Sequence, residues 1–139
     1  MVTQPSRDIL SLLREHGIQP SAQRLAVAEY VLSTDQHPSA DQVWERVRAA
    51  FPMLSRATVY NTLSLFVRVG LLRPLILAEG KVVFDPNVQA HHHLIDSTTG
   101  KIFDIPWHRL QVSNINDLQG FEVDEYMVVL RGRKSGAGT

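Results

Sequence analysis

Apolar side chains recur at helical spacing through the first half of the chain, and short polar breaks separate these stretches. Residues 6–15 form one such stretch, and residues 20–32 form a second that opens at Pro-Ser. Ser39 and Gln42 make the S-x-x-Q pattern of a capping box, and the apolar face behind them ends near Pro52. This pattern predicts three successive helices.

A fourth helix and a hairpin follow. Ser55 can cap a helix that runs to about Gly70, and its apolar positions fall on one face. After that glycine the pattern changes to two short apolar runs, 71–77 and 82–85, separated by the turn-like segment 78–81. Four helices followed by a β-hairpin is the element order of a winged helix-turn-helix domain.

The second half of the chain combines strand-like and helix-like patterns. Residues 91–95 and 101–105 flank a Ser-Thr-Thr-Gly turn and predict a second hairpin. Residues 107–118 are interpreted as a helix, and the valine-rich run 121–130 as a strand.

These elements predict an α+β fold with two domains. We expect a winged-helix DNA-binding domain over residues 1–85, a hinge over 86–90, and a small α/β dimerisation and metal-binding domain over 91–139. A strand-rich domain of roughly fifty residues is marginal alone, so a homodimer is expected. A two-fold dimer would match a palindromic double-stranded DNA operator.

Composition limits the partners and the chemistry. The formal net charge is zero, with eight Lys/Arg against six Asp/Glu in residues 1–73 and six against eight in residues 74–139, so DNA binding must rest on local charge. The absence of cysteine excludes disulfides and thiolate metal ligands. No apolar run has the length of a signal peptide or a membrane span, and a cytoplasmic protein without a membrane partner is expected.

Histidine and carboxylate side chains gather after the hairpin. His91 and His93 project from the same face of a strand, so both can reach one ion, while His92 points the other way. Asp104 on the paired strand can approach from beside them, and Asp85 lies at the end of the first hairpin. Spacing alone leaves metal binding and a polar surface equally open.

The chain resembles the ferric-uptake-regulator family of bacterial metalloregulators over about residues 5–132. The resemblance is carried by four motifs: HPSADQVWERV at 37–47, SRATVYNTLSLFVRVGLL at 55–72, VVFDPN at 82–87 and HHHLIDSTTGKIFDI at 91–105. It implies an N-terminal winged-helix domain, a C-terminal dimerisation domain and a regulatory metal held between them.

Matched by position, the resemblance assigns five ligands to that metal: His37, Asp85, His91, His93 and Asp104. From its spacing alone, His37 in the His-Pro dipeptide would be interpreted as an ordinary loop residue. The motif match instead implies that it is a metal ligand. The expected cofactor is one divalent ion per subunit, Fe²⁺ or Mn²⁺, with Zn²⁺ as a further candidate. An ion shared by the two domains would couple metal binding to DNA binding.

The resemblance also places a tyrosine of the fourth helix in the major groove. We expect DNA contacts from Arg24, Arg56, Tyr60, Asn61 and Arg73, with Lys81 of the wing as a further candidate.

Two features of the family are altered in this chain. Many members carry a structural zinc site of two C-x-x-C pairs, and the matching positions here fall near Asp96 and Thr99 and in the tail, so a cysteine-ligated zinc is not expected. A second metal site seen in some members would need ligands near His92 and Glu125.

The resemblance further indicates the signal. An aspartate at position 104 is typical of the peroxide sensors. In those proteins bound ferrous iron reacts with hydrogen peroxide, the resulting oxidant modifies a ligand histidine, here His37 or His91, and metal and DNA are released. We therefore expect a transcriptional regulator, a repressor, and not an enzyme. The alternatives are an iron-responsive or haem-responsive regulator of the same family, a metalloenzyme with His91, His93 and a carboxylate as its triad, and a DNA-binding scaffold with a vestigial metal site.

Overall fold

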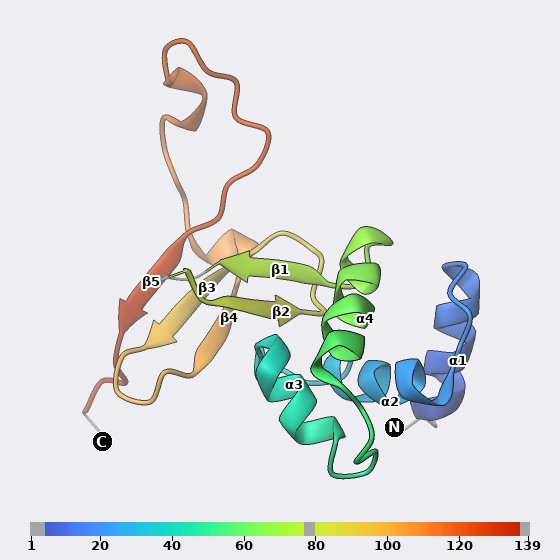
Figure 1. The fold of residues 1–139 in the computed structure, drawn as a ribbon. Coiled ribbons are helices and arrows are strands. Elements are labelled where there is room, and N and C mark those ends of the chain that lie inside the picture. Colours follow the sequence, from blue (N-terminus) through green and yellow to red (C-terminus); the bar gives the residue numbers. More distant parts are fainter. Residues whose placement is uncertain (1–4, 77–79, 137–139) are drawn as a thin grey trace. The chain divides into compact units, whose positions relative to one another are not determined.

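The computed structural model describes residues 5–76 and 80–136, with the side chains described from residue 9 onward. The chain divides into two compact units, residues 1–88 and residues 89–139. Each unit is described by itself below (Figure 1).

Four helices form the first unit, in the order that the sequence predicts. They are α1 (Pro5–Glu15), α2 (Ala22–Val31), α3 (Ala40–Val47) and α4 (Arg56–Arg68). A serine caps each of the last three, because its hydroxyl accepts a backbone N–H of the first turn: Ser21, Ser39 and Ser55. At Ser39 both halves of the capping box are present, which confirms that prediction.

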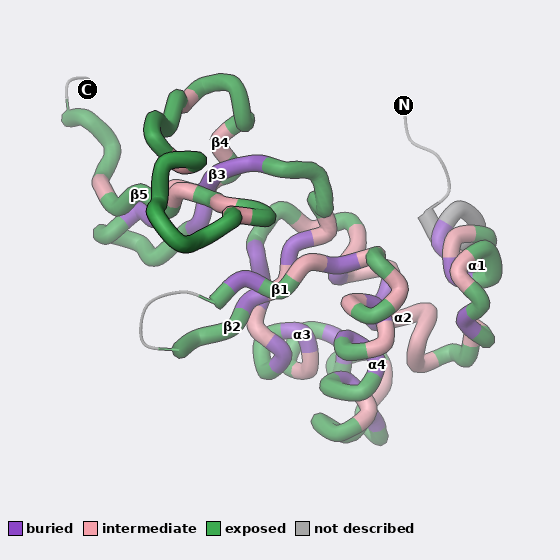
Figure 2. The backbone as a smooth tube through the Cα atoms, turned by 90° about the horizontal axis from the view of Figure 1, so that it is seen from above, coloured by how far each residue is buried: buried purple, intermediate pink, exposed green. Residues whose placement is uncertain are grey.

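The core of this unit lies between the helices. Phe66 and Leu63 of α4 are almost completely buried, together with Val43 of α3 and Val27 of α2. Figure 2 shows buried positions where these helices face one another and exposed positions on their outer sides. Burial of these side chains stabilises the helices and fixes the orientation of α4.

The wing follows α4 as predicted. Gly70 has a φ of +86°, a left-handed conformation that ends the helix and turns the chain toward the hairpin. Strands β1 (Arg73–Ile76) and β2 (Val82–Asp85) pair antiparallel, with Arg73 opposite Asp85. The predicted turn at 78–81 lies partly outside the described residues.

A three-stranded sheet organises the second unit. It contains β3 (His91–Asp96), β4 (Ile102–Pro106) and β5 (Val129–Gly132), in the order β4-β3-β5. Strand β3 pairs antiparallel with β4 and parallel with β5, so it has a hydrogen-bonded neighbour on each side. The hairpin predicted over 91–105 is therefore confirmed.

Two other predictions for this half were wrong. Residues 107–118 form two short 3₁₀ turns, Trp107–Arg109 and Ile115–Asp117, because Asn114 adopts a left-handed φ of 66° that interrupts a helix. The expected long strand is reduced to β5, because only Val129–Gly132 pairs with β3 in a regular ladder, and strands need such a partner. Figure 1 shows the intervening segment looping away from the sheet.

Hydrogen bonds close the turn between β3 and β4 and connect it to the C-terminal segment. The Asp96 carboxylate accepts the N–H of Thr98 (2.9 Å), which lowers its pKa. Ser97 donates its N–H (2.7 Å) and its hydroxyl (2.9 Å) to the carbonyl of Gly132. These contacts link the two segments where the resemblance places the cysteine pairs of other family members.

Among the described residues, no helix is long and apolar enough to cross a membrane.

The cap of α3 gives a test of stability. Replacing Ser39 with alanine removes the hydroxyl that accepts the Gln42 N–H, so the free energy of unfolding should fall by about 1 kcal/mol. Urea unfolding followed by circular dichroism measures this change. Ser64→Ala, at an exposed position within α4, serves as the control and should leave stability equal or slightly higher.

Candidate metal centre and nucleic-acid interface

His37 lies in a constrained loop of the first unit. Its φ is +52°, a left-handed conformation that costs a residue with a side chain about 1–2 kcal/mol. The loop is held because Phe84 of β2 donates its N–H to the carbonyl of the buried Pro38 (2.9 Å). This contact brings the loop to the end of the wing, where Asp85 follows Phe84.

The imidazole of His37 meets the carboxylate of Asp85 at that point. Nε2 lies 3.1 Å from Oδ2, and both side chains are almost fully buried. The other carboxylate oxygen accepts the backbone N–H of Asn87 (2.9 Å), which fixes the orientation of the carboxylate. The first unit therefore presents one oriented histidine–carboxylate pair.

The second unit presents a similar group. His91 and His93 point to the same side of β3, with their ring centroids 4.4 Å apart. Asp104 of β4 lies across the ladder from His93. Its Oδ1 is 3.4 Å from Nε2 of His91 and 3.5 Å from Nε2 of His93. The strand alternation predicted from the sequence therefore brings all three side chains together.

The tautomer of His91 follows from its other nitrogen. Nδ1 lies 2.6 Å from the carbonyl oxygen of Gln89, which can only accept a hydrogen bond, so Nδ1 carries the proton. In the neutral ring, Nε2 then directs a lone pair at the Asp104 carboxylate. Two acceptors facing each other repel, and either a proton or a metal cation between them relieves that repulsion.

The separations suit a metal cation. Two ligand atoms, each about 2.1 Å from an ion, lie about 3.0 Å apart at right angles and about 3.4 Å apart at the tetrahedral angle. The histidine–carboxylate distances of 3.1, 3.4 and 3.5 Å are close to these values. Imidazole nitrogen and carboxylate oxygen also form a donor set that suits divalent zinc, iron and manganese.

His92 has a different environment on the opposite face of β3. It is fully buried, and its ring stacks on Trp107 with centroids 4.5 Å apart. Its Nδ1 accepts the N–H of Val128 (3.0 Å), so a metal at Nε2 would leave the ring without any proton. Neutral histidine ligands keep one, and the geometry therefore argues against the second metal site considered for His92 and Glu125.

The expected DNA-contacting side chains lie on and around α4. Tyr60 is 49% exposed, and its hydroxyl donates to the Asp41 carboxylate at 3.4 Å. The Arg56 guanidinium lies 3.8 Å from the same carboxylate and 4.4 Å from the ring centre of Trp44. Asp41 therefore contacts both side chains, and Trp44 contacts Arg56. Sequence reasoning missed Asp41 and Trp44, because their contacts depend on how α3 packs against α4.

The remaining candidates fall in two places. Arg24 and Asn61 line the same shallow pocket between α2 and α4, and the Arg24 guanidinium donates to the carbonyl of Gln19 (2.9 Å). Lys81 and Tyr60 border a groove between α4 and the wing. Arg73 lies at the other end of the wing, opposite Asp85, and not beside Lys81.

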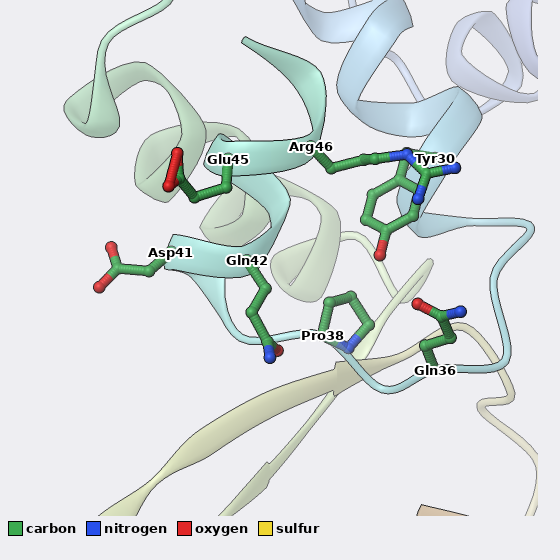
Figure 3. Close-up of a pocket in the computed structure, with 7 residues that line it drawn as sticks. All are labelled: Tyr30, Gln36, Pro38, Asp41, Gln42, Glu45 and Arg46. Carbon is green, nitrogen blue, oxygen red and sulfur yellow. The ribbon is translucent and has the colours of Figure 1, made fainter. Parts of the chain in front are cut away.

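A further pocket of about 450 Å³ lies beside α3 in the first unit. Figure 3 shows Arg46 lying against Tyr30, while the carboxylates of Asp41 and Glu45 point away from that ring.

Comparison with known proteins places the chain in a family. The model described as "Ferric uptake regulator family" matches residues 15–131. The chain belongs to this family. It is accordingly a metalloregulator of transcription and not an enzyme, and its fold is a winged-helix DNA-binding domain joined to a small dimerisation domain.

Relatives within the ferric uptake regulator family include peroxide-responsive proteins. The chain is 35% identical over 101 residues to the peroxide-responsive repressor PerR of Staphylococcus aureus, covering 73% of this chain and 68% of that one. It is similar to the PerR structure from Streptococcus pyogenes, with a TM-score of 0.54 and 26% identity, covering 96% and 93%. The Vibrio cholerae ferric uptake regulator has the same fold, with a TM-score of 0.69 and 22% identity over 90% and 98%.

The geometry of the second unit predicts which side chains bind metal. Asp104→Asn should lower the affinity for Mn²⁺ by at least the ~10–100-fold that follows loss of a ligand-orienting contact, because an amide does not supply the carboxylate charge. Competition against a fluorescent chelator measures the affinity. Asp117→Asn, in the exposed turn after β4, is the matched control and should bind like the wild type. Equal affinity of the two variants would contradict the assignment.

Proposed function

We propose that this chain is a peroxide-sensing, metal-gated repressor that binds a palindromic DNA operator as a homodimer. The observation that carries the proposal is the pair of oriented histidine–carboxylate groups, one in each unit. Their donor atoms match the five ligands that the sequence resemblance assigns. The proposal is that both groups bind the same divalent ion, Fe²⁺ or Mn²⁺, with the hinge of residues 86–90 between them.

Such an ion would act on the DNA-reading elements through the chain itself. His37 lies two residues before the N-cap of α3, and Asp85 is the last residue of the wing. A metal ion bound by both residues would therefore hold the beginning of α3 and the end of the hairpin together. Joined to His91, His93 and Asp104, the ion would fix the angle between the two domains, and hence the spacing of the two α4 helices in a dimer.

On the DNA side, the proposal assigns major-groove contacts to Tyr60 and Asn61 and phosphate contacts to Arg24 and Arg56. Arg73 and Lys81 would contact DNA from the wing. Tyr60 and Arg56 would exchange their contacts with Asp41 for contacts with DNA, since all three side chains are accessible on the surface. Backbone phosphates attract arginine, whereas base edges supply the specificity.

Peroxide sensing is supported by the peroxide-responsive relatives and by the aspartate at position 104. Bound ferrous iron would supply the electrons that cleave hydrogen peroxide beside its ligands. The residues proposed to be oxidised are His37 and His91. Both rings are buried beside a carboxylate of the proposed site, so an oxidant formed at the ion would be generated next to them.

Metal-gated DNA binding can be measured before the operator sequence is identified. A pool of random-sequence duplexes is enriched on the Mn²⁺-loaded protein, and the affinity of the enriched DNA is measured by fluorescence anisotropy with Mn²⁺ or with chelator. We expect chelation to weaken binding by roughly 5–150-fold, the usual range of allosteric coupling.

His37→Ala and His91→Ala should abolish this difference, and His108→Ala, outside both histidine–carboxylate groups, should retain it. Binding that is equally tight with metal and with chelator, or a pool that yields no enriched sequence, would contradict the gated-repressor proposal.

Oxidation of the ferrous protein tests the signal. Peroxide added to the Fe²⁺-loaded chain should release the enriched DNA and add one oxygen atom to peptides that contain His37 or His91, as detected by mass spectrometry. The Mn²⁺-loaded chain should keep its DNA under the same treatment. Two other results would favour the alternatives, provided that the histidines stay unmodified. Release of the DNA on adding haem would favour a haem-responsive regulator, and release on iron depletion alone would favour an iron-responsive one.

A further inference from the structure

Met127 contacts the histidine group of the second unit. Its sulfur lies 3.2 Å from Nδ1 of His93, the nitrogen that faces away from Asp104. The backbone beside it is fixed to β3, because Val128 accepts the N–H of His93 (3.0 Å) and donates its own N–H to Nδ1 of His92 (3.0 Å). The thioether is therefore held against the ring of His93.

The chemistry of this contact orients His93. A thioether sulfur accepts hydrogen bonds weakly and donates none, so a hydrogen bond here requires a proton on Nδ1 of His93. Nε2 then carries the lone pair that faces Asp104. Met127 thus does for His93 what the Gln89 carbonyl does for His91: it selects the tautomer that can bind a cation through Nε2.

Met127 is also accessible to small oxidants. The residue is 37% exposed, whereas His93, which its sulfur contacts, is 2% exposed. Thioethers react with peroxide to give sulfoxides, and the reaction requires no metal. Peroxide in solvent can therefore reach Met127, the residue that orients the buried ring of His93.

We propose that Met127 is a second, iron-independent oxidation site whose sulfoxide weakens metal binding through His93. Hydrogen peroxide transfers one oxygen atom to the sulfur: a sulfur lone pair forms the S–O bond, the O–O bond breaks, and the departing hydroxide takes up the remaining proton and leaves as water. The sulfur is oxidised by two electrons and the peroxide is reduced by two.

The new oxygen changes the contact with His93. With sulfur 3.2 Å from Nδ1, an oxygen bound to the sulfur cannot lie between the two atoms unless the ring or the methionine moves. The sulfoxide is also polar, whereas the thioether packs as an apolar group. The lesion is chemically reversible, since sulfoxide reductases restore the thioether. This inference rests on the proposed metal site at His93 but needs neither iron nor DNA.

The chain contains its own control. It has three methionines, of which Met53 lies in the first unit and is 89% exposed. Met53→Leu leaves Met127 as the oxidisable sulfur under test, and Met127→Leu leaves Met53, while Met1 is present in both variants. Each protein is treated with hydrogen peroxide in the presence of chelator, the peroxide is removed with catalase, and the sulfoxides are located by peptide mass spectrometry.

The readout is the affinity for Mn²⁺, measured before and after treatment. In Met53→Leu we expect Met127 to gain one oxygen atom and the Mn²⁺ affinity to fall by about ten-fold, as when a contact that orients a ligand is lost. Reduction by methionine sulfoxide reductase should restore it. In Met127→Leu, peroxide should leave the Mn²⁺ affinity unchanged although Met53 is oxidised.

Two results would overturn the proposal: a Met127 sulfur that stays unoxidised when Met53 is fully converted, or a Met127 sulfoxide with unchanged Mn²⁺ affinity. The second result is read on the folded Met53→Leu protein, so misfolding of a Met127 variant does not affect it. If the untreated wild type bound no Mn²⁺ or Zn²⁺, the metal site itself would be refuted. Loss of metal-gated DNA binding alone would refute only the proposed function.

Discussion

The group of His91, His93 and Asp104 depends on strand β3 being hydrogen-bonded to a strand on each side. Pairing with β4 places Asp104 opposite His93, and pairing with β5 places Val128 and Met127 beside the same strand. Because successive side chains of a strand point to opposite faces, consecutive histidines acquire separate roles. Two face a carboxylate, and the third is buried against Trp107.

Electrostatics then determines what this group can bind. When the Nδ1–H groups donate to the Gln89 carbonyl and the Met127 sulfur, the Nε2 lone pairs of both rings face an anionic oxygen. Such an arrangement stabilises a cation and disfavours an anionic ligand. The groups that orient the rings are thus as much a part of the site as the atoms that would touch the ion.

In the first unit, the same segments serve the histidine–carboxylate pair and the DNA-reading elements. The strained backbone at His37 persists because Pro38 is buried and its carbonyl accepts a hydrogen bond from the wing. The next residue, Ser39, begins the capping box of α3. Asp41 in the first turn of that helix holds side chains of α4. Packing between α3, α4 and the wing therefore connects the end of the wing to the surface proposed to read DNA.

The sequence by itself determined the elements whose signals are local. Serine caps, helical periodicity and the glycine after α4 specified the four helices and the wing, and period-two alternation specified that His91 and His93 share a face. The motif match also named Asp85 and Asp104. Each of these signals lies within a few residues of the feature it specifies.

Only the tertiary structure decided the features that depend on distant neighbours. Among the described residues, the ladder with β3 begins only at Val129, so most of the valine-rich run 121–130 forms no strand, and its apolar composition could not reveal that. Met127 reaches His93, and Asp41 reaches Arg56, through packing between segments far apart in the chain. Hydrogen-bond partners in space, and not residue type, set the tautomer of each histidine and therefore which nitrogen can bind metal.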